Sequence, residues 1–292
     1  MKQVATRSRS RGFSLVEVMV SLVIGLVVVG AVIVSTIGSV KAGRYQSAYA
    51  QMNEDAQIGL SILSRDLQMA GYAQPTAVTT SGSGASLVLT LSSTTLGTST
   101  PVFGCDTGFA DPTASSLICG TATTPGFEVV YQADARNTVP TSGGVPSDCL
   151  GNGISSGPPY VAHNRYFLSS GSSGRTELYC ASNNAANTPQ PLIENVEDMQ
   201  LRYGTSLLAT PSQVVRYESA TEINNLGVAA AAEWAQVISV RLCLLVRSAE
   251  PVLNPGDDTV TYRDCSGTLV TPTDRYLRRA YFTTATVRDK MP

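Results

Sequence analysis

The residue whose chemistry is hardest to explain by packing alone is Glu17, a single carboxylate near the start of a long apolar segment. Residues 13–34 contain no other charged side chain. A carboxylate in hydrocarbon costs about 2.5–3.5 kcal/mol on insertion scales, so it persists most readily where a cation compensates it. A cut between Gly12 and Phe13 would create such a cation, an α-ammonium one helical turn before Glu17. Without that cut, Glu17 would snorkel to the membrane interface or remain protonated.

Cysteines offer a second kind of chemistry, and their number and spacing favour disulfides. The sequence has six cysteines, no CxxC motif and one histidine, so it lacks the closely spaced ligand pairs of a zinc site. An even number of cysteines behind an export-type N-terminus indicates disulfides in an oxidising compartment, with buried free thiols as the alternative. Many pairings are possible. We favour the neighbours in sequence, which are Cys105–Cys119, Cys149–Cys180 and Cys243–Cys265.

The remaining candidates for catalysis or metal binding are weak. His163 is the only histidine, so a Ser–His–Asp arrangement would have to use it, but no G-x-S-x-G motif is present and we expect a surface histidine. Asp257, Asp258 and Asp264 could offer oxygen ligands to calcium, but they lack EF-hand spacing and fit an acidic turn better. The sequence also has no phosphate-binding loop and no GxGxxG motif. It therefore predicts a protein that is not an enzyme and has no cofactor or metal.

Composition indicates a surface suited to assembly or to an extracytoplasmic location. Charged residues make up 14% of the 292 residues, against about 25% in average proteins. The net charge is −2, so there is no basic excess to bind nucleic acid. The first 12 residues contain four basic residues and no acid, whereas the rest of the chain is net negative. This asymmetry marks residues 1–12 as a separate functional unit.

The apolar segment is long enough to cross a bilayer, which requires about 20 residues. The basic residues before it would stay in the cytoplasm and direct the C-terminus outward. An ordinary signal peptide ends in an A-x-A-like cleavage site after the apolar run, and none is found here. Instead, glycine and an aromatic residue precede the apolar segment, so cleavage there would remove the leader and keep the helix.

The stretch "GFSLVEVMVSLVIG" resembles the class III signal of type IV prepilins. The resemblance implies cleavage between Gly12 and Phe13 by a prepilin peptidase, and N-methylation of Phe13. It also implies that Glu17 pairs with the N-terminal amine of a neighbouring subunit during assembly. Such a pair would cancel two buried charges and set the axial register of adjacent helices.

A helix is expected to continue well beyond the membrane segment. The sequence has no proline before Pro75, and Gly71 suits a helix end. After residue 40, apolar residues recur every three or four positions, which is the spacing of one helical face: Tyr45, Tyr49, Met52, Ala56, Leu60, Leu63, Leu67 and Ala70. We therefore predict one helix over residues 13–70, with residues 13–40 in the membrane or filament core and residues 41–72 entering a globular head. Arg65 and Asp66 are expected on a solvated face, the alternative being a pair with the head or a neighbouring subunit.

Residues 73–292 read as a β-rich head. The clearest strand is "AQVISVRLCLLVRS", in which apolar residues alternate with a mostly polar face that includes Cys243. "RYFLSSGSSGRTELYCAS" reads as a hairpin, and "SLVLTLSS", "FEVVYQ", "MQLRYG", "VVRYES" and "RRAYFTTATVRD" read as further strands. Trp234 is expected in the core. The fold class is therefore α+β, with a long N-terminal helix packed on an antiparallel sheet and loops stapled by disulfides. The prepilin resemblance implies that this fold is type IV pilin-like.

Four stretches resemble the PilW family of minor pilins. They are "YQSAYAQMNEDAQIGLSILSRDLQMAGY", "LIENVEDMQLRYG", "VISVRLCLLVRS" and "DRYLRRAYFTTATVRD", and they occur in the family's order. Residues 75–190 resemble nothing that we can place. The resemblance implies a priming subunit of a type IV pilus, in a tip or initiation complex with other minor pilins, the major pilin and a tip adhesin. It also implies contact with the inner-membrane assembly platform. The precursor would be a single-pass inner-membrane protein with a periplasmic head, and the mature chain would reach the pilus at the cell surface.

Two other functions remain open at the level of sequence. A minor pseudopilin of a type II secretion system would use the same leader chemistry, and the PilW-like stretches favour the pilus instead. A membrane-tethered periplasmic enzyme would keep an uncleaved N-terminus and have a pocket around His163.

Overall fold

The protein is described by a computed structural model that covers residues 12–80, 87–91, 100–171, 174–182, 188–207, 212–256 and 259–287. The basic leader over residues 1–11 and the acidic pair Asp257 and Asp258 lie outside these ranges. The chain divides into two compact units, Met1–Ser47 and Ala48–Pro292, which are described separately.

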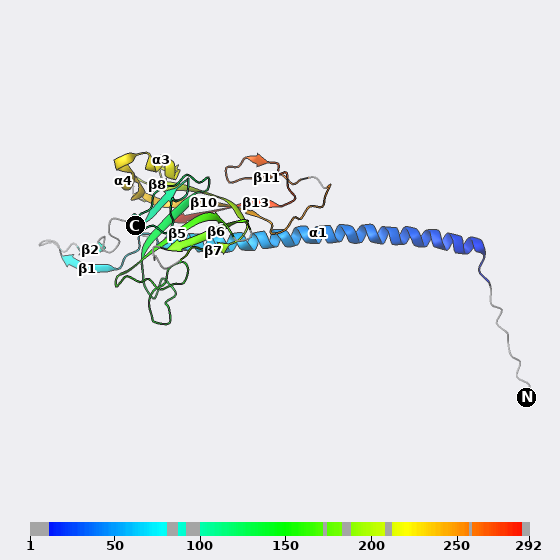
Figure 1. Cartoon of the computed structure of the whole chain (residues 1–292), viewed down its shortest axis with the longest axis horizontal. Helices are drawn as coiled ribbons and strands as arrows, with labels where there is room; N and C mark the ends of the chain where they lie inside the picture. Colours follow the sequence, from blue (N-terminus) through cyan, green and yellow to red (C-terminus); the bar gives the residue numbers. More distant parts are fainter. Residues whose placement is uncertain are drawn as a thin grey trace, which may run out of the picture. The chain divides into compact units, whose positions relative to one another are not determined.

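The N-terminal part of the chain forms one helix, α1 (Leu15–Met69), as predicted (Figure 1). The helix is uninterrupted because no proline occurs before Pro75. It ends where Gly71 adopts a φ of 80°, a left-handed conformation that glycine takes at little cost. The amide of Gly71 donates a hydrogen bond of 2.9 Å to the carbonyl of Val130, which fixes the end of the helix to the head.

In the first unit, apolar side chains cover every side of α1. All large hydrophobic residues from Phe13 to Val40 are at least half exposed. The hydroxyl of Ser21 donates to the carbonyl of Glu17 at 2.7 Å, and that of Ser39 donates to the carbonyl of Ser35 at 3.0 Å, so these polar groups are satisfied within the helix. The helix is long and apolar enough to cross a membrane.

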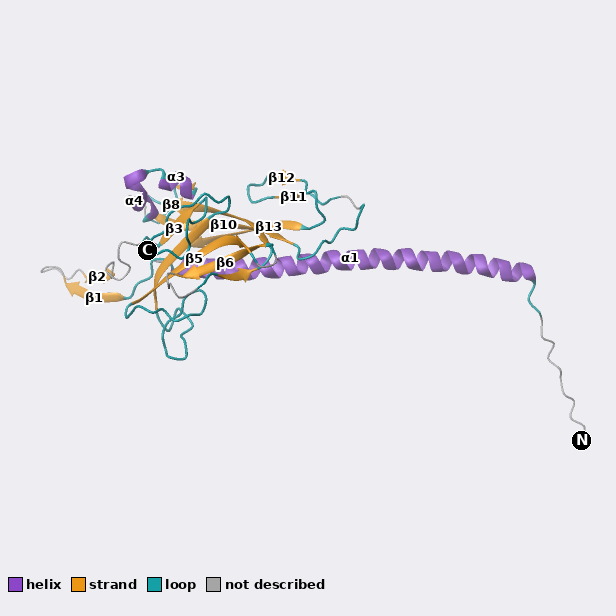
Figure 2. Cartoon of the chain, in the orientation of Figure 1, coloured by secondary structure: helices purple, strands orange, loops and turns teal. Residues whose placement is uncertain are grey.

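The second unit contains two larger antiparallel sheets (Figure 2). The first has the order β3 (Val102–Cys105), β4 (Gly126–Ala133), β5 (Tyr160–Ser170), β6 (Thr176–Ser182) and β7 (Gln190–Ile193). The second has the order β13 (Arg278–Thr286), β10 (Val237–Arg247), β8 (Val196–Thr205) and β9 (Arg216–Glu218). Two short pairs join β1 (Pro75–Thr80) to β2 (Leu87–Leu91) and β11 (Tyr262–Arg263) to β12 (Leu269–Val270). The α+β class and the predicted hairpin of β5 and β6 are confirmed.

The core of the second unit lies between the C-terminal part of α1 and the sheets. Met52, Ala56, Leu63 and Leu67 are fully buried, which confirms the predicted helical stripe. Gly59 lies on the same stripe, and a Cβ atom at this position would be 3.2 Å from Leu244 of β10 and 3.3 Å from Ile193 of β7. The helix therefore contacts β10 and β7, one strand of each larger sheet, at a glycine.

Short helices lie between β9 and β10 in the chain, and the first of them contacts β3 and β8, one strand of each larger sheet. They are α3 (Ala220–Asn224), the 3₁₀ turn η1 (Gly227–Ala229) and α4 (Ala230–Trp234). Ser219 and Glu222 form a capping box at the start of α3. Trp234 is buried, with its ring centroid 4.7 Å from that of Tyr203 and its Nε1 donating to Asn224 at 2.8 Å. The expectation of a core tryptophan is confirmed.

Candidate assembly site and head pocket

The candidate cleavage site lies just before the helix begins. Gly12 and Phe13 are exposed and have no regular secondary structure, whereas α1 starts at Leu15. An exposed, non-helical peptide bond can be drawn into a peptidase site without unwinding a helix. The predicted bond is therefore accessible in this geometry.

Glu17 lies in the first turn of α1 and its side chain is exposed. The N-terminal end of a helix carries unpaired backbone N–H groups and a partial positive charge, which favours a carboxylate there. A new ammonium group on Phe13 would add a full positive charge at the same end. The arrangement thus supplies one anion at the point where cleavage would create one cation, within a surface that is otherwise apolar.

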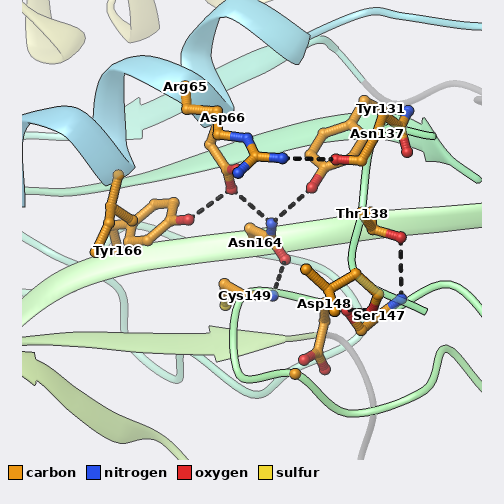
Figure 3. A pocket seen from close by; sticks show the side chains of 13 residues that line it. Arg65, Asp66, Tyr131, Asn137, Thr138, Ser147, Asp148, Cys149, Asn164 and Tyr166 are labelled. Carbon is orange, nitrogen blue, oxygen red and sulfur yellow. Dashed lines mark hydrogen bonds between the residues drawn. The ribbon is translucent and has the colours of Figure 1, made fainter. Parts of the chain in front are cut away.

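Asp66 of α1 is held by the five-stranded sheet rather than by water (Figure 3). Its Oδ2 accepts a hydrogen bond of 2.6 Å from the side-chain amide of Asn164 and one of 2.5 Å from the hydroxyl of Tyr166, both on β5. The expected solvated face was therefore wrong for Asp66, because β5 packs against this side of the helix. Arg65 is exposed and donates a long hydrogen bond of 3.4 Å to the carbonyl of Asn137. Both Arg65 and Asp66 therefore contact the head, which was the alternative considered from the sequence.

Asn164 connects Asp66 to the rest of the pocket (Figure 3). Its amide also donates to the Tyr131 hydroxyl at 3.2 Å, and its carbonyl oxygen accepts from the backbone N–H of Cys149 at 3.0 Å. The helix end, two strands and a disulfide-bonded loop thus meet at one side chain. The pocket has a volume of about 270 Å³.

Burial sets the electrostatics of this pocket. It raises the pKa of Asp66, and the hydrogen bonds from Tyr166 and Asn164 only partly oppose that rise. Burial and the neighbouring Asp66 carboxylate also raise the pKa of the Tyr166 hydroxyl well above its ordinary value. Neither group is arranged to activate a nucleophile. The chemistry that the geometry supports is attachment of the helix end to the head.

His163 is not the surface histidine that the sequence led us to expect. Its Nδ1 lies 3.2 Å from Oε1 of Glu128, and the same oxygen accepts a bond of 2.8 Å from Nε of Arg165. Arg165 is fully buried and also donates to the carbonyls of Pro112 and Ala114, at 2.8 and 2.6 Å. Burial alone would raise the pKa of Glu128, but His163 and Arg165 lower it below its ordinary value. The histidine thus lies beside the Glu128–Arg165 ion pair, and Arg165 holds the loop of Pro112 and Ala114 on the sheet.

The structure contains three disulfides, Cys105–Cys119, Cys149–Cys180 and Cys243–Cys265, which are the pairs that we favoured from the sequence. They close segments with sequence separations of 14, 31 and 22 residues. Each anchors a loop or turn to a strand, because Cys105, Cys180 and Cys243 lie in β3, β6 and β10.

The described residues contain no group of three or more His, Cys, Asp or Glu side chains able to hold a metal ion. Asp264 accepts hydrogen bonds from the backbone and hydroxyl of Ser266 and from the backbone of Thr268. That is the geometry of an acidic turn, although Asp257 and Asp258 lie outside the described residues.

Sequence reasoning missed the residues that receive Asp66. Asn164 and Tyr166 are two positions apart on β5, so their side chains lie on the same face of the sheet. Asp66 lies directly before Leu67 and three positions after Leu63, at the margin of the buried stripe. A carboxylate at the margin of a buried stripe was the sequence signal for a contact between Asp66 and the head.

An uninterrupted helix with an apolar first part, a carboxylate in its first turn and an antiparallel α+β head together define a type IV pilin-like protein. Residues 7–33 match the family model of the prokaryotic N-terminal methylation motif. Residues 165–289 match the family model of the type IV pilus-assembly protein W. Within its class, the chain is therefore similar to the PilW family over its C-terminal part.

Among solved structures, a type IV-like pilin from Thermus thermophilus is similar to this chain. The two are 11% identical, the similarity covers 83% of this chain and 100% of the other, and the TM-score is 0.36. No curated protein matches the chain.

Proposed function

We propose that this chain is a minor pilin that is inserted in the inner membrane, trimmed between Gly12 and Phe13, N-methylated at Phe13 and incorporated into a type IV pilus. The observation that carries the proposal is the presence, on one chain, of a methylation motif over residues 7–33 and a PilW-type region over residues 165–289. The first supports processing and assembly through α1, and the second supports a pilus rather than the pseudopilus of a type II secretion system.

The proposed mechanism uses the geometry of the helix start. The leader holds the precursor with its basic residues in the cytoplasm and its head in the periplasm, where the disulfides form. A prepilin peptidase removes the leader and leaves an ammonium on Phe13. Glu17 of one subunit then neutralises the ammonium of another, and this pair sets the axial position of the incoming helix. The apolar side chains of residues 13–40 exchange lipid for neighbouring helices.

The partners proposed for the head follow from the PilW assignment. They are the other minor pilins and the major pilin, with a tip or initiation complex as the site of action and a tip adhesin as a further member. The inner-membrane assembly platform would recruit the processed chain. The three disulfides support this role, because they keep the shape of exposed loops in an oxidising environment.

The proposal is tested by comparing wild type with Glu17→Ala in membranes and in sheared filaments. Mass spectrometry of the filament-associated wild-type chain should find methylated Phe13 as its first residue. Glu17→Ala should be trimmed normally but be depleted in filaments by about tenfold or more, the ratio expected for a lost interaction of about 1.4 kcal/mol.

Glu54→Ala is the matched control, since Glu54 is an exposed acid on the same helix but outside the apolar segment. It should leave the amount of filament-associated chain unchanged. A filament-associated chain that retains its first 12 residues would contradict the proposed processing. Normal incorporation of Glu17→Ala would contradict the charge pair, and co-purification with secretion components in place of pilins would favour the pseudopilus.

A further inference from the structure

Two arginines with the same charge lie directly opposite each other on the four-stranded sheet. Arg202 of β8 and Arg241 of β10 are paired in register, so their side chains lie on the same face. Like charges directly opposite each other destabilise an antiparallel pair. Arg202 has a carboxylate, Glu222, at 3.5 Å, but both side chains are more than half exposed and such pairs are weak. The guanidinium of Arg241 lies 3.8 Å from the ring centroid of Tyr217.

A pocket of about 520 Å³ lies beside this arginine pair. Its walls come from β8, β10 and β13 and from the turn between β11 and β12, which the Cys243–Cys265 disulfide attaches to the sheet. Phe282 of β13 forms part of the wall and is 64% exposed. It lies directly opposite Cys243 in the register of β10 and β13. Among the described residues that line the pocket, two are arginines and none is acidic.

We infer that this pocket is a docking surface for an acidic peptide segment of a partner protein. A carboxylate of the segment would lie between Arg202 and Arg241, where it relieves their repulsion and accepts the parallel N–H groups of a guanidinium. An apolar side chain of the same segment would cover Phe282. The combination of arginine with an exposed aromatic ring is typical of protein interfaces, whereas a free anion would leave Phe282 in water.

The inference goes beyond the proposed function, because it concerns one face of the head and does not require the chain to enter a filament. Residues 13–292 contain 16 basic and 22 acidic residues, so an acidic segment would be attracted mainly where basic side chains gather. The arginine pair would then determine both where and in which orientation the segment binds.

The test places a photo-crosslinking side chain at the docking surface of the full-length protein in cells, by the substitution Phe282→p-benzoylphenylalanine. We expect adducts with a partner protein, and mass spectrometry should map them to a segment that carries an aspartate or glutamate. Adding Arg241→Glu should reduce the adduct about tenfold or more, a ratio equivalent to about 1.4 kcal/mol. Arg241→Lys should retain most of it. Replacing the mapped carboxylate of the partner with lysine should restore the adduct of the Arg241→Glu chain.

Arg136→Glu is the matched control, since Arg136 is an exposed arginine of the head outside this pocket, and it should leave the adduct unchanged. Benzoylphenylalanine at the exposed Ile118 serves as the control for crosslinking elsewhere on the head. Adducts that map only to lipid, to polysaccharide or to segments without a carboxylate would overturn the inference, as would an adduct that Arg241→Glu leaves intact. The adduct is measured in the membrane fraction, before assembly. A chain that fails to enter filaments can therefore still form the adduct, and the two results are distinguished.

Discussion

At the scale of single residues, the two carboxylates that matter most on α1 are in opposite environments. Glu17 is exposed at the helix start, whereas Asp66 is enclosed by β5, and burial raises its pKa above the ordinary value of 3.8. An acid whose pKa is higher in the folded protein stabilises the fold in its protonated form. Its contribution is complete below the unfolded pKa and is lost as pH rises through the folded pKa.

This linkage predicts the behaviour of Asp66→Asn. Asparagine keeps an oxygen that can accept from Tyr166 but cannot ionise. The free energy of unfolding of the wild type, measured by denaturant titration in detergent, should therefore fall relative to the variant as pH rises from about 4 to about 7. Asp66→Ala, which removes both hydrogen bonds, should be less stable than wild type by about 1–3 kcal/mol.

Asp264→Asn is the matched control for that measurement. The hydroxyl of Ser266 holds the pKa of Asp264 below its ordinary value, so this group is fully ionised in both the folded and unfolded states above about pH 6. The difference in free energy of unfolding between Asp264→Asn and wild type should therefore be constant near pH 7, and toward pH 4 it should change in the direction opposite to that of Asp66→Asn. A wild type that gains stability relative to Asp66→Asn as pH rises would show that the proposed sign is wrong.

At the scale of elements, Gly59 determines how closely α1 can approach both sheets. A larger side chain at this position would meet Leu244 and Ile193 in a filled core. Gly59→Leu should therefore lower the free energy of unfolding by about 1–3 kcal/mol, the usual cost of overpacking. Gly43→Ala is the control on the same helix, since a Cβ at Gly43 has no neighbour within 4 Å. This variant should stabilise α1 slightly, because alanine favours a helix more than glycine does. Unchanged stability of Gly59→Leu by denaturant titration would refute this account of the helix contact.

The C-terminal part of the helix could be predicted because its burial is periodic along the sequence: the stripe through Met52, Leu63 and Leu67 repeats every three or four residues. The central strands gave a weaker signal. Nine of the eleven residues of β10 and seven of the eight residues of β4 are buried, so neither strand shows alternating burial. The environment of Asp66 could not be predicted because it depends on Asn164 and Tyr166, which are about a hundred residues away in sequence.

At the scale of the whole molecule, the boundary between the compact units falls inside α1, after Ser47. The part of the helix that follows belongs to the head by its packing, since Met52, Leu63 and Leu67 are buried there. Burying three such side chains contributes about 1.5–3 kcal/mol each, so together they contribute about 4.5–9 kcal/mol. That sum approaches the entire stability of many domains, which is about 5–15 kcal/mol.

A chain that begins at Ala48 should therefore be soluble, form the three disulfides and unfold cooperatively, because it keeps the buried stripe and lacks the exposed apolar helix. A chain that begins at Ala73, directly after the helix, should fail to fold or should aggregate, since it exposes the core that the helix covered. Circular dichroism during thermal unfolding and mapping of the disulfides distinguish the two. Equal stability of both chains would show that the helix is attached to a head that is already complete, and the boundary would then lie at the end of α1.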